Sequence, residues 1–161
     1  MSEVVLGVDP GTAVTGYGVL EATKGRVGRL VECGVIRTRP TSPLGTRLAT
    51  LYDGVGELLA THRPRVLAVE GVFYAKNVRT TITLSHARGV ILLAAAHAGV
   101  EVAEFSPAVV KKTVVGEGRA TKGQVGYMVQ QLLRLERPPS PSDAADGVAL
   151  ALTYLLTRGS R

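Results

Sequence analysis

Cysteine and aromatic residues are scarce in this chain of 161 residues. It contains one cysteine, Cys33, two phenylalanines, five tyrosines and no tryptophan. A single cysteine excludes an internal disulfide bond and indicates a reducing compartment, which we take to be the cytoplasm. Among so few aromatic residues, the adjacent pair Phe73 and Tyr74 stands out as a candidate for an interaction with a partner.

Long apolar runs are also missing. The longest, Val90–Ala96, is far short of the ~20 residues needed to span a membrane. The first predicted strand begins within a few residues of Met1, which leaves no room for a signal peptide, and we expect no membrane association. With 45% hydrophobic and 20% charged residues, the composition predicts one globular domain over residues 1–158, followed by a short basic tail at 159–161.

Acidic residues are fewer than basic ones. The chain has 13 Asp and Glu against 19 Lys and Arg, which gives a formal net charge of +6. This balance favours an anionic partner, and nucleic acid before a membrane surface, because no basic amphipathic helix stands out. Charge alone does not establish such a partner, since many basic proteins bind nothing acidic.

The first strand carries the first candidate site residue. Val4–Val8 is mostly β-branched and apolar, which predicts a buried strand, and Asp9 follows it directly. Pro10 and Gly11 then turn the chain. An aspartate in this position is held at the edge of a sheet on a rigid element. The alternative is an ordinary acid of an Asp-Pro-Gly turn.

A second strand ends in an acid in the same way. The order of strands and helices predicts an α/β fold with a mixed five-stranded sheet flanked by helices. Arg65–Glu70 is expected to lie parallel to the first strand, because a helix predicted over Leu44–Thr61 separates it from the preceding strands. Glu70 and Asp9 would then project from the same edge of the sheet, beyond the carboxyl ends of the strands. The other predicted elements are strands over Thr15–Glu21, Val27–Ile36 and Val100–Phe105, and helices over Thr81–Ala98, from Pro107 through Lys112, from Thr121 to Leu133 and over Gly147–Leu156.

Two further acids open the last helix. Asp143 and Asp146 are three residues apart, so they share one face of its first turn. Acids at this position also favour the helix dipole and can cap the helix, which is the purely structural interpretation. Gly147 weakens the helix by ~0.5–1 kcal/mol, which favours a functional interpretation. Glycines at positions 7, 16, 18 and 34 weaken the strands but permit a close approach of the backbone.

Basic and aromatic residues supply candidate contacts to nucleic acid. The loop from Gly71 to Arg79 combines an aromatic pair with cations, which suits base stacking beside phosphate contacts. Lys122 opposes the dipole of the helix that it begins, so helix stability does not explain it. The alternatives are that Phe73 packs into the core and that the cations are solvated. The candidates are Phe73, Tyr74, Lys76, Asn77, Arg79, Lys111, Lys112, Arg119 and Lys122.

The helix predicted over Thr81–Ala98 is apolar nearly all round in its second half. Such a helix is either central to the core or covered by a partner chain. Both interpretations stay open at this point.

The four acids together predict a metal site. Carboxylates gathered at one place repel each other, and at least one would have a raised pKa without a cation. Carboxylate oxygens suit Mg²⁺ or Mn²⁺, and the chain has no Cys/His cluster for zinc. Two such ions ~3.5–4 Å apart can hold the attacking and leaving oxygens of a phosphoryl displacement. An acid cluster on a basic protein therefore predicts a metal-dependent nuclease.

Several of these motifs resemble the RuvC family of Holliday-junction resolvases, and the resemblance covers essentially the whole chain. The motifs are Gly7-Val8-Asp9-Pro10-Gly11, Thr15-Gly16-Tyr17-Gly18, Val69-Glu70, Phe73-Tyr74-Ala75-Lys76-Asn77, Ala87-Arg88-Gly89-Val90, Val110-Lys111-Lys112-Thr113-Val114-Val115-Gly116 and Asp143-Ala144-Ala145-Asp146.

The resemblance implies a ribonuclease H-like fold and a set of roles. Asp9, Glu70, Asp143 and Asp146 would be the catalytic, metal-binding acids, Phe73 would stack at the junction, and Lys111 and Lys122 would lie near the scissile phosphate. It also implies a homodimer that nicks two opposed strands of a four-way junction and works with the branch-migration proteins RuvA and RuvB. Where some members carry a histidine in the last helix, this chain has Tyr154.

Two alternatives remain. The chain could be a non-catalytic junction-binding protein, against which the complete acid set argues. It could also be a fragment of an actin-like ATPase or sugar kinase, since Asp9-Pro10-Gly11-Thr12 resembles their first phosphate loop. Those proteins need two lobes and a second phosphate loop, and neither is present.

Overall fold

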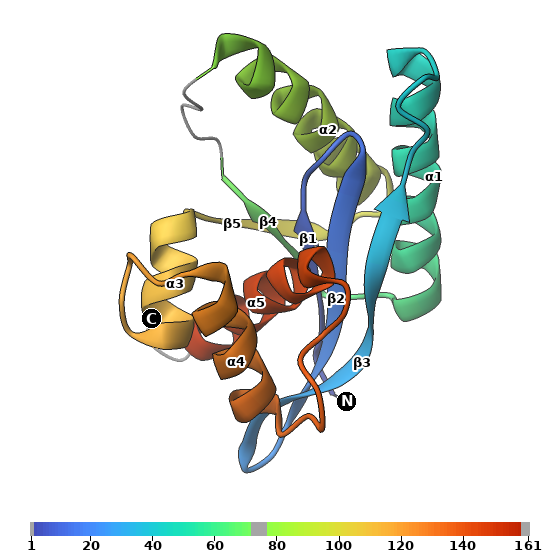
Figure 1. Ribbon diagram of the computed structural model, residues 1–161. Helices are drawn as coiled ribbons and strands as arrows, with labels where there is room; N and C mark the ends of the chain where they lie inside the picture. The colour runs from blue at the N-terminus through green and yellow to red at the C-terminus, as the bar shows by residue number, and fades with distance from the viewer. Residues whose placement is uncertain (1, 72–76, 159–161) are drawn as a thin grey trace.

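The structure is a computed structural model that describes residues 2–71 and 77–158 (Figure 1). The predicted DNA contacts Phe73, Tyr74 and Lys76 lie outside the described residues, and so does the tail at 159–161.

A mixed sheet of five strands forms the centre of the fold, in the order β3-β2-β1-β4-β5. β1 (Val4–Asp9), β2 (Val14–Thr23) and β3 (Arg26–Arg37) form an antiparallel meander. β4 (Val66–Glu70) pairs in parallel with β1, and β5 (Glu101–Phe105) pairs in parallel with β4. The predicted mixed sheet, and the predicted place of the Glu70 strand beside the first strand, are confirmed.

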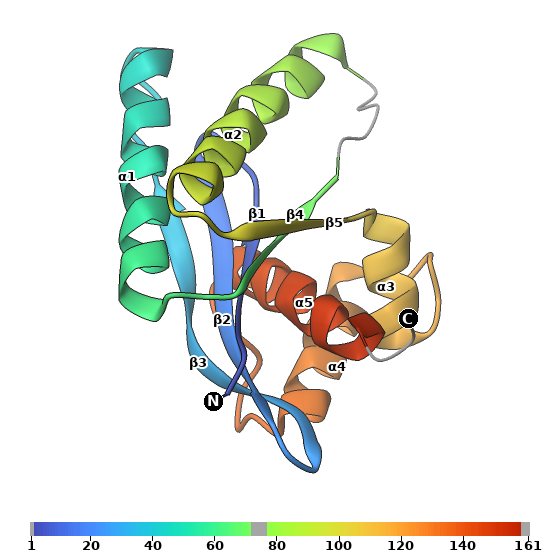
Figure 2. The ribbon, with the colours of Figure 1, turned by 180° about the vertical axis from the view of Figure 1, so that it is seen from behind.

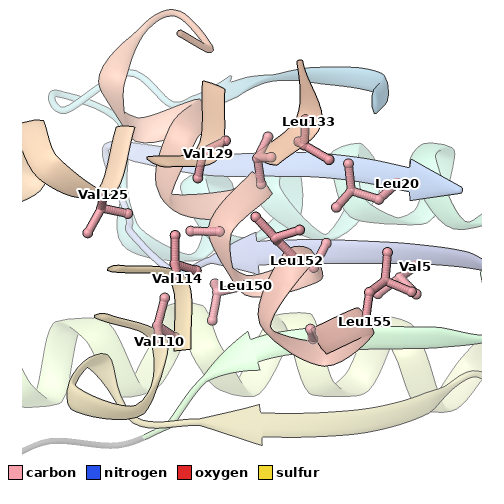
Figure 3. Close-up of a cluster of buried hydrophobic side chains, with 14 of the residues drawn as sticks. Val5, Leu20, Val110, Val114, Val125, Val129, Leu133, Leu150, Leu152 and Leu155 are labelled. Atoms are coloured by element: carbon pink, nitrogen blue, oxygen red, sulfur yellow. The ribbon is translucent and has the colours of Figure 1, made fainter. Parts of the chain in front are cut away.

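Helices cover both faces of the sheet (Figures 1 and 2). α1 (Leu44–His62) and α2 (Val78–His97) lie on one face. α5 (Ser142–Thr157) lies on the other, with α3 (Pro107–Val115) and α4 (Lys122–Leu133) packed against it. Each face has its own hydrophobic core, and Figure 3 shows the core beneath α5.

Strand β1 contributes to both cores because its side chains alternate. Val5 belongs to the core beneath α5, whereas Leu6 and Val8 belong to the core beneath α1 and α2. All three side chains are fully buried. A strand covered on both faces needs apolar residues at every position, which explains the continuous apolar run before Asp9.

Glycines let α5 lie directly on the sheet. A Cβ atom added to Gly7 would lie 2.0 Å from the carbonyl oxygen of Gly147, and one added to Gly18 would lie 2.6 Å from the Cα of Val148. A Cβ added to Gly147 would lie 2.5 Å from the Cα of Tyr17. The close approach expected for the strand glycines is confirmed at positions 7, 16 and 18. Gly147 is explained by this packing, so its use as a sign of function was wrong.

Helix ends differ from the prediction by a few residues. α2 begins at Val78 rather than Thr81, because the Asn77 side chain accepts a hydrogen bond from the backbone N–H of Arg79 and caps the helix. α4 begins as predicted, with a capping box between Thr121 and Gln124. None of the helices in the described residues combines the length and the apolar character required to cross a membrane.

Helix α2 is only partly buried. Ala87, Ile91, Ala94 and Ala95 face the core beneath α1 and α2. Ile82 and Leu93 are 53% and 49% exposed. One face of the helix is therefore core, and a second apolar face is left open in the single chain.

Candidate active site

Asp9 and Glu70 stand side by side at one edge of the sheet. Val8 and Val69 are register partners in the parallel ladder between β1 and β4, so the residues that follow them leave the sheet together. Burial, a hydrogen bond with Glu70 and repulsion from the Glu70 and Asp146 carboxylates raise the pKa of Asp9 from 3.8 to about 9. At neutral pH and without a cation, the Asp9–Glu70 pair therefore holds a proton in the hydrogen bond between its two carboxyl groups.

The turn after Asp9 is fixed by Thr15. This fully buried side chain donates a hydrogen bond to the Gly11 carbonyl at 2.6 Å and accepts one from the Gly11 N–H at 3.2 Å. A Cβ on Gly11 would lie 2.1 Å from the Val14 carbonyl oxygen, so the turn requires glycine. The role of Thr15 was missed from the sequence, although its position within the Thr15-Gly16-Tyr17-Gly18 motif was a usable signal.

Asp146 approaches the strand acids from helix α5 and is paired with Lys122. The Lys122 Nζ lies 3.0 Å from the Asp146 Oδ2. Burial raises the pKa of Asp146, and the Lys122 ammonium partly offsets that effect. The hydrogen bond to Asp146 raises the pKa of Lys122 in turn. Lys122 opposes the dipole of its own helix α4, and its position is explained by the ion pair with Asp146 of α5.

Asp143 stands at the side of this group. Its carbonyl oxygen lies over Gly16, the register partner of Asp9 in the ladder between β1 and β2. Its charge acts on Lys122 and Asp146, raising the pKa of both. Asp143 does not line the pocket formed by the other three acids, so the structure brings three of the predicted acids together and leaves the fourth beside them.

A pocket of about 210 Å³ contains the acids and two of the predicted lysines. Asp9, Glu70 and Asp146 line it together with Lys111 and Lys122. Its other walls are apolar and come from three helices: Pro107 and Val110 of α3, Val125 of α4, and Ala149 and Leu150 of α5. Several of these side chains belong to the core shown in Figure 3, so the pocket is built on a rigid base.

The other predicted contacts lie away from this pocket. Lys112 and Arg119 are exposed, and neither lines it. Asn77 caps α2, and Arg79 is exposed in the first turn of the same helix. The Tyr154 hydroxyl donates to the Glu3 carboxylate at 3.4 Å, beside the start of β1 and so at the opposite end of that strand from Asp9.

Arg88 is a residue whose motif was noticed but whose contacts were not foreseen. Its Nε donates to the carbonyl oxygen of Glu70 at 3.4 Å, and its guanidinium pairs with Glu104 on β5. Arg88 thereby connects α2 with the ends of the two neighbouring strands β4 and β5. An arginine just before the apolar second half of α2 is the signal from which an ion pair with a neighbouring strand could have been inferred.

The acid group fits a metal by its chemistry, although its side chains are partnered in another way in this structure. Within residues 2–71 and 77–158, no three His, Cys, Asp or Glu side chains stand close enough together to hold a cation as they are. Asp9 instead shares a proton with Glu70, and Asp146 is paired with Lys122. The donor chemistry nevertheless fits a divalent cation, because the donors are hard carboxylate oxygens. The Asp146 Oδ2 is also buried, and its partner is the Lys122 ammonium at 3.0 Å, which a cation could replace.

The fold and the acid site together define a class of protein. The sheet is an antiparallel three-stranded meander continued by two parallel strands, and helices cover both of its faces. Acids stand at the ends of the two strands β1 and β4. These features are those of a ribonuclease H-like nuclease domain. The family described as crossover junction endodeoxyribonuclease RuvC matches residues 5–154. The chain belongs to the RuvC family.

Individual relatives agree with this assignment. The chain is 49% identical over 151 residues to the crossover junction endodeoxyribonuclease RuvC of Pelotomaculum thermopropionicum, covering 94% of this chain and 92% of the relative. A solved Thermus thermophilus RuvC structure superposes with a TM-score of 0.88 at 35% identity, covering 98% of this chain and 96% of that one. T. thermophilus RuvC in complex with a Holliday junction substrate superposes with a TM-score of 0.89 at 37% identity, covering 96% and 93%. These comparisons do not favour the ATPase or sugar-kinase alternative or the non-catalytic one.

Proposed function

We propose that this chain is an endonuclease that resolves four-way DNA junctions by metal-dependent hydrolysis of one phosphodiester bond in each of two opposed strands. The observation that carries the proposal is the pocket in which Asp9, Glu70 and Asp146 face Lys111 and Lys122. Acids that hold cations and lysines that attract phosphate are needed at the same place for this reaction, and they line one pocket here. Membership of the family and the likeness to the junction-bound T. thermophilus structure support the same substrate.

The acids would hold the metal. Asp9, Glu70, Asp146 and Asp143 would bind two Mg²⁺ ions, with Mn²⁺ as a substitute, and the ions would activate a water and stabilise the charge that develops on the phosphate. Binding of a cation would release the proton that Asp9 shares with Glu70. Lys122 keeps the Asp146 carboxylate oriented toward the pocket, and its own side chain is 70% exposed, where it could meet an incoming strand. Lys111 adds a second positive charge on the neighbouring wall.

The remaining parts of the proposal concern assembly and partners. A homodimer is supported by the apolar face of α2 that this chain leaves open, because one cluster cuts one strand and resolution needs two cuts. Phe73, Tyr74, Lys76, Asn77 and Arg79 would contact the junction beside this helix, and Lys112 and Arg119 would add contacts from α3 and from the segment before α4. RuvA and RuvB would be its partners in a reducing cytoplasm.

The deciding experiment is cleavage of a synthetic four-way junction labelled on each strand in turn. With Mg²⁺, paired nicks at symmetric positions in two opposed strands are expected, and EDTA should abolish them. A linear duplex of the same sequence is the control for structure selectivity. Tight junction binding without any cleavage in Mg²⁺ or Mn²⁺ would instead identify a non-catalytic junction-binding protein.

A further inference from the structure

A groove leads away from the active-site pocket along helix α4. It lies between the exposed side of α4 and the Pro138–Ser142 connector, and its volume is about 420 Å³. Lys122 and Asp146 line both this groove and the active-site pocket. The two hollows therefore adjoin at the Lys122–Asp146 ion pair, and a strand that leaves the acids past this pair would lie along the groove. We refer to it as the α4 groove.

Glycines keep the α4 groove open. Gly123 and Gly126 both line it, and both lie inside a helix, where glycine costs ~0.5–1 kcal/mol relative to alanine. The glycines of the sheet and of α5 are required by packing, but these two are not. Among the described residues, a Cβ on Gly126 would meet no atom within 4 Å, and one on Gly123 would meet only the Thr121 hydroxyl at 3.9 Å. The two glycines therefore lower the stability of α4, and what they provide is open space beside the active site.

Tyr127 borders the same groove and does not contribute to either hydrophobic core. Its side chain is 59% exposed, and it makes no hydrogen bond or ring contact with the described residues. An aromatic ring beside a phosphate-binding cation is the arrangement that proteins use to hold a single strand, because the ring stacks on a base of any sequence. Lys122, five residues earlier on the same helix, supplies that cation.

We propose that the α4 groove holds a nucleotide of the cleaved DNA strand next to the scissile phosphate, with its base stacked on Tyr127. This inference rests on the proposed function. Five residues of α-helix span ~7.5 Å along the helix axis, so the base on Tyr127 belongs to a nucleotide within one or two of the bond that is cut. Only a locally unstacked strand can offer such a base, which a junction provides and a continuous duplex does not.

The test compares Tyr127→Ala with Tyr127→Phe, which keeps the ring and removes the hydroxyl. Binding of a four-way junction is measured in the Asp9→Asn background, and single-turnover cleavage in the otherwise wild-type chain. Tyr127→Ala should weaken junction binding by about 5- to 150-fold, the range that one base–aromatic stack supplies. Tyr127→Phe should bind within about twofold of the parent, because stacking needs only the ring.

A fluorescent base reports the contact directly. 2-Aminopurine is placed at the first or second nucleotide on either side of the cut in a junction bound by the Asp9→Asn protein. At one of these positions, the 2-aminopurine fluorescence should be quenched in the complexes with the Tyr127 protein and with Tyr127→Phe. It should be higher in the complex with Tyr127→Ala. Unchanged fluorescence at every position in all three proteins would overturn the assignment of a base to Tyr127.

A second variant keeps the proposal testable if position 127 tolerates no change. Gly126→Leu fills the α4 groove, and Gly56→Leu is its matched control. Gly56 lies inside α1, remote from the acids, and also has no atom within 4 Å of an added Cβ. Gly126→Leu should reduce junction affinity at least as much as Tyr127→Ala, and Gly56→Leu should not.

Failure of the inference and failure of the proposed function give different results. If the wild-type chain cuts no junction, the proposed function is wrong. If it cuts normally and Tyr127→Ala and Gly126→Leu also bind and cut normally, only the groove assignment is overturned.

Discussion

The carbonyl oxygen of Asp143 lies directly over Gly16, the residue that pairs with Asp9 across the ladder between β1 and β2. A Cβ at position 16 would come within 1.7 Å of this oxygen. Because Gly16 has no side chain, the first turn of α5, which carries Asp143 and Asp146, can rest on β2 beside Asp9. The active site depends on this contact as much as on the acids themselves.

Gly16→Ala should disrupt the site by moving α5. The obstructing atom belongs to the backbone of Asp143, so no side-chain rotation can relieve the clash, and overpacking of this kind costs ~1–3 kcal/mol or more. We expect a lower free energy of unfolding and loss of junction cleavage. Gly56→Ala is the control and should raise stability by up to ~1 kcal/mol through helix propensity. Denaturant unfolding of both variants measures the difference, and a Gly16→Ala protein as stable as wild type would contradict the contact.

Asp9→Asn should abolish cleavage and leave junction binding intact. Loss of a group that merely orients a metal ligand costs ~10–100-fold, so loss of a ligand should exceed that range. Phosphate contacts come from lysines, which this substitution does not touch. Cleavage of a labelled junction in Mg²⁺ and binding in EDTA are the two measurements. Appreciable metal-dependent cleavage by a well-folded Asp9→Asn protein would remove Asp9 from the metal site.

Without divalent metal, stability should fall as pH rises. The pKa of Asp9 is raised to about 9, whereas the unfolded chain titrates near 3.8. Between these values the folded state binds more protons than the unfolded state, so the free energy of unfolding decreases with increasing pH. Melting temperatures in EDTA from pH 5 to 9 should decline more steeply for wild type than for Asp9→Asn. Added Mg²⁺ should raise the wild-type value most at the alkaline end, and equal slopes for the two proteins would refute the shared proton.

Lys111→Ala and Lys122→Ala should each lower the salt dependence of junction binding. Every phosphate contact that is lost reduces the slope of log K against log salt by ~1. Lys122→Ala should also slow cleavage, because Asp146 loses its ion-pair partner. Lys24→Ala is the control, since Lys24 is exposed in the turn between β2 and β3, at the end of β2 remote from the acids. Unchanged salt slopes for Lys111→Ala and Lys122→Ala would make both lysines ordinary surface residues.

Leu93→Glu should separate the proposed homodimer without unfolding the chain. Leu93 is exposed on α2, so a charge there disturbs only an interface between chains. Leu92 is the contrasting site, because it packs against the core beneath α1 and α2 and its replacement by glutamate should destabilise the fold. Light scattering should give a monomer for Leu93→Glu, and junction resolution should be lost. A wild-type monomer that resolves junctions would rule out the need for a dimer.

The sequence by itself determined the elements and the acids. Short apolar runs and helical periodicity are local properties, so the strands that end in Asp9 and Glu70 were predictable. The parallel pairing of β1 with β4 followed from the intervening helix α1. The spacing of Asp143 and Asp146 was also readable from the chain. The N-terminal end of α2 and the meaning of Gly147 were not, because a side-chain cap and a backbone contact with another element have no local signature.

Only the tertiary structure decided how the acids are partnered. Lys122 and Asp146 are 24 positions apart and meet because α4 and α5 pack side by side. Asp143 stands beside the pocket rather than in it, at the point where the first turn of α5 rests on Gly16 of β2. The α4 groove, likewise, exists only where a helix and a distant connector come together. Such contacts depend on the distances between elements, which the order of residues along a chain does not record.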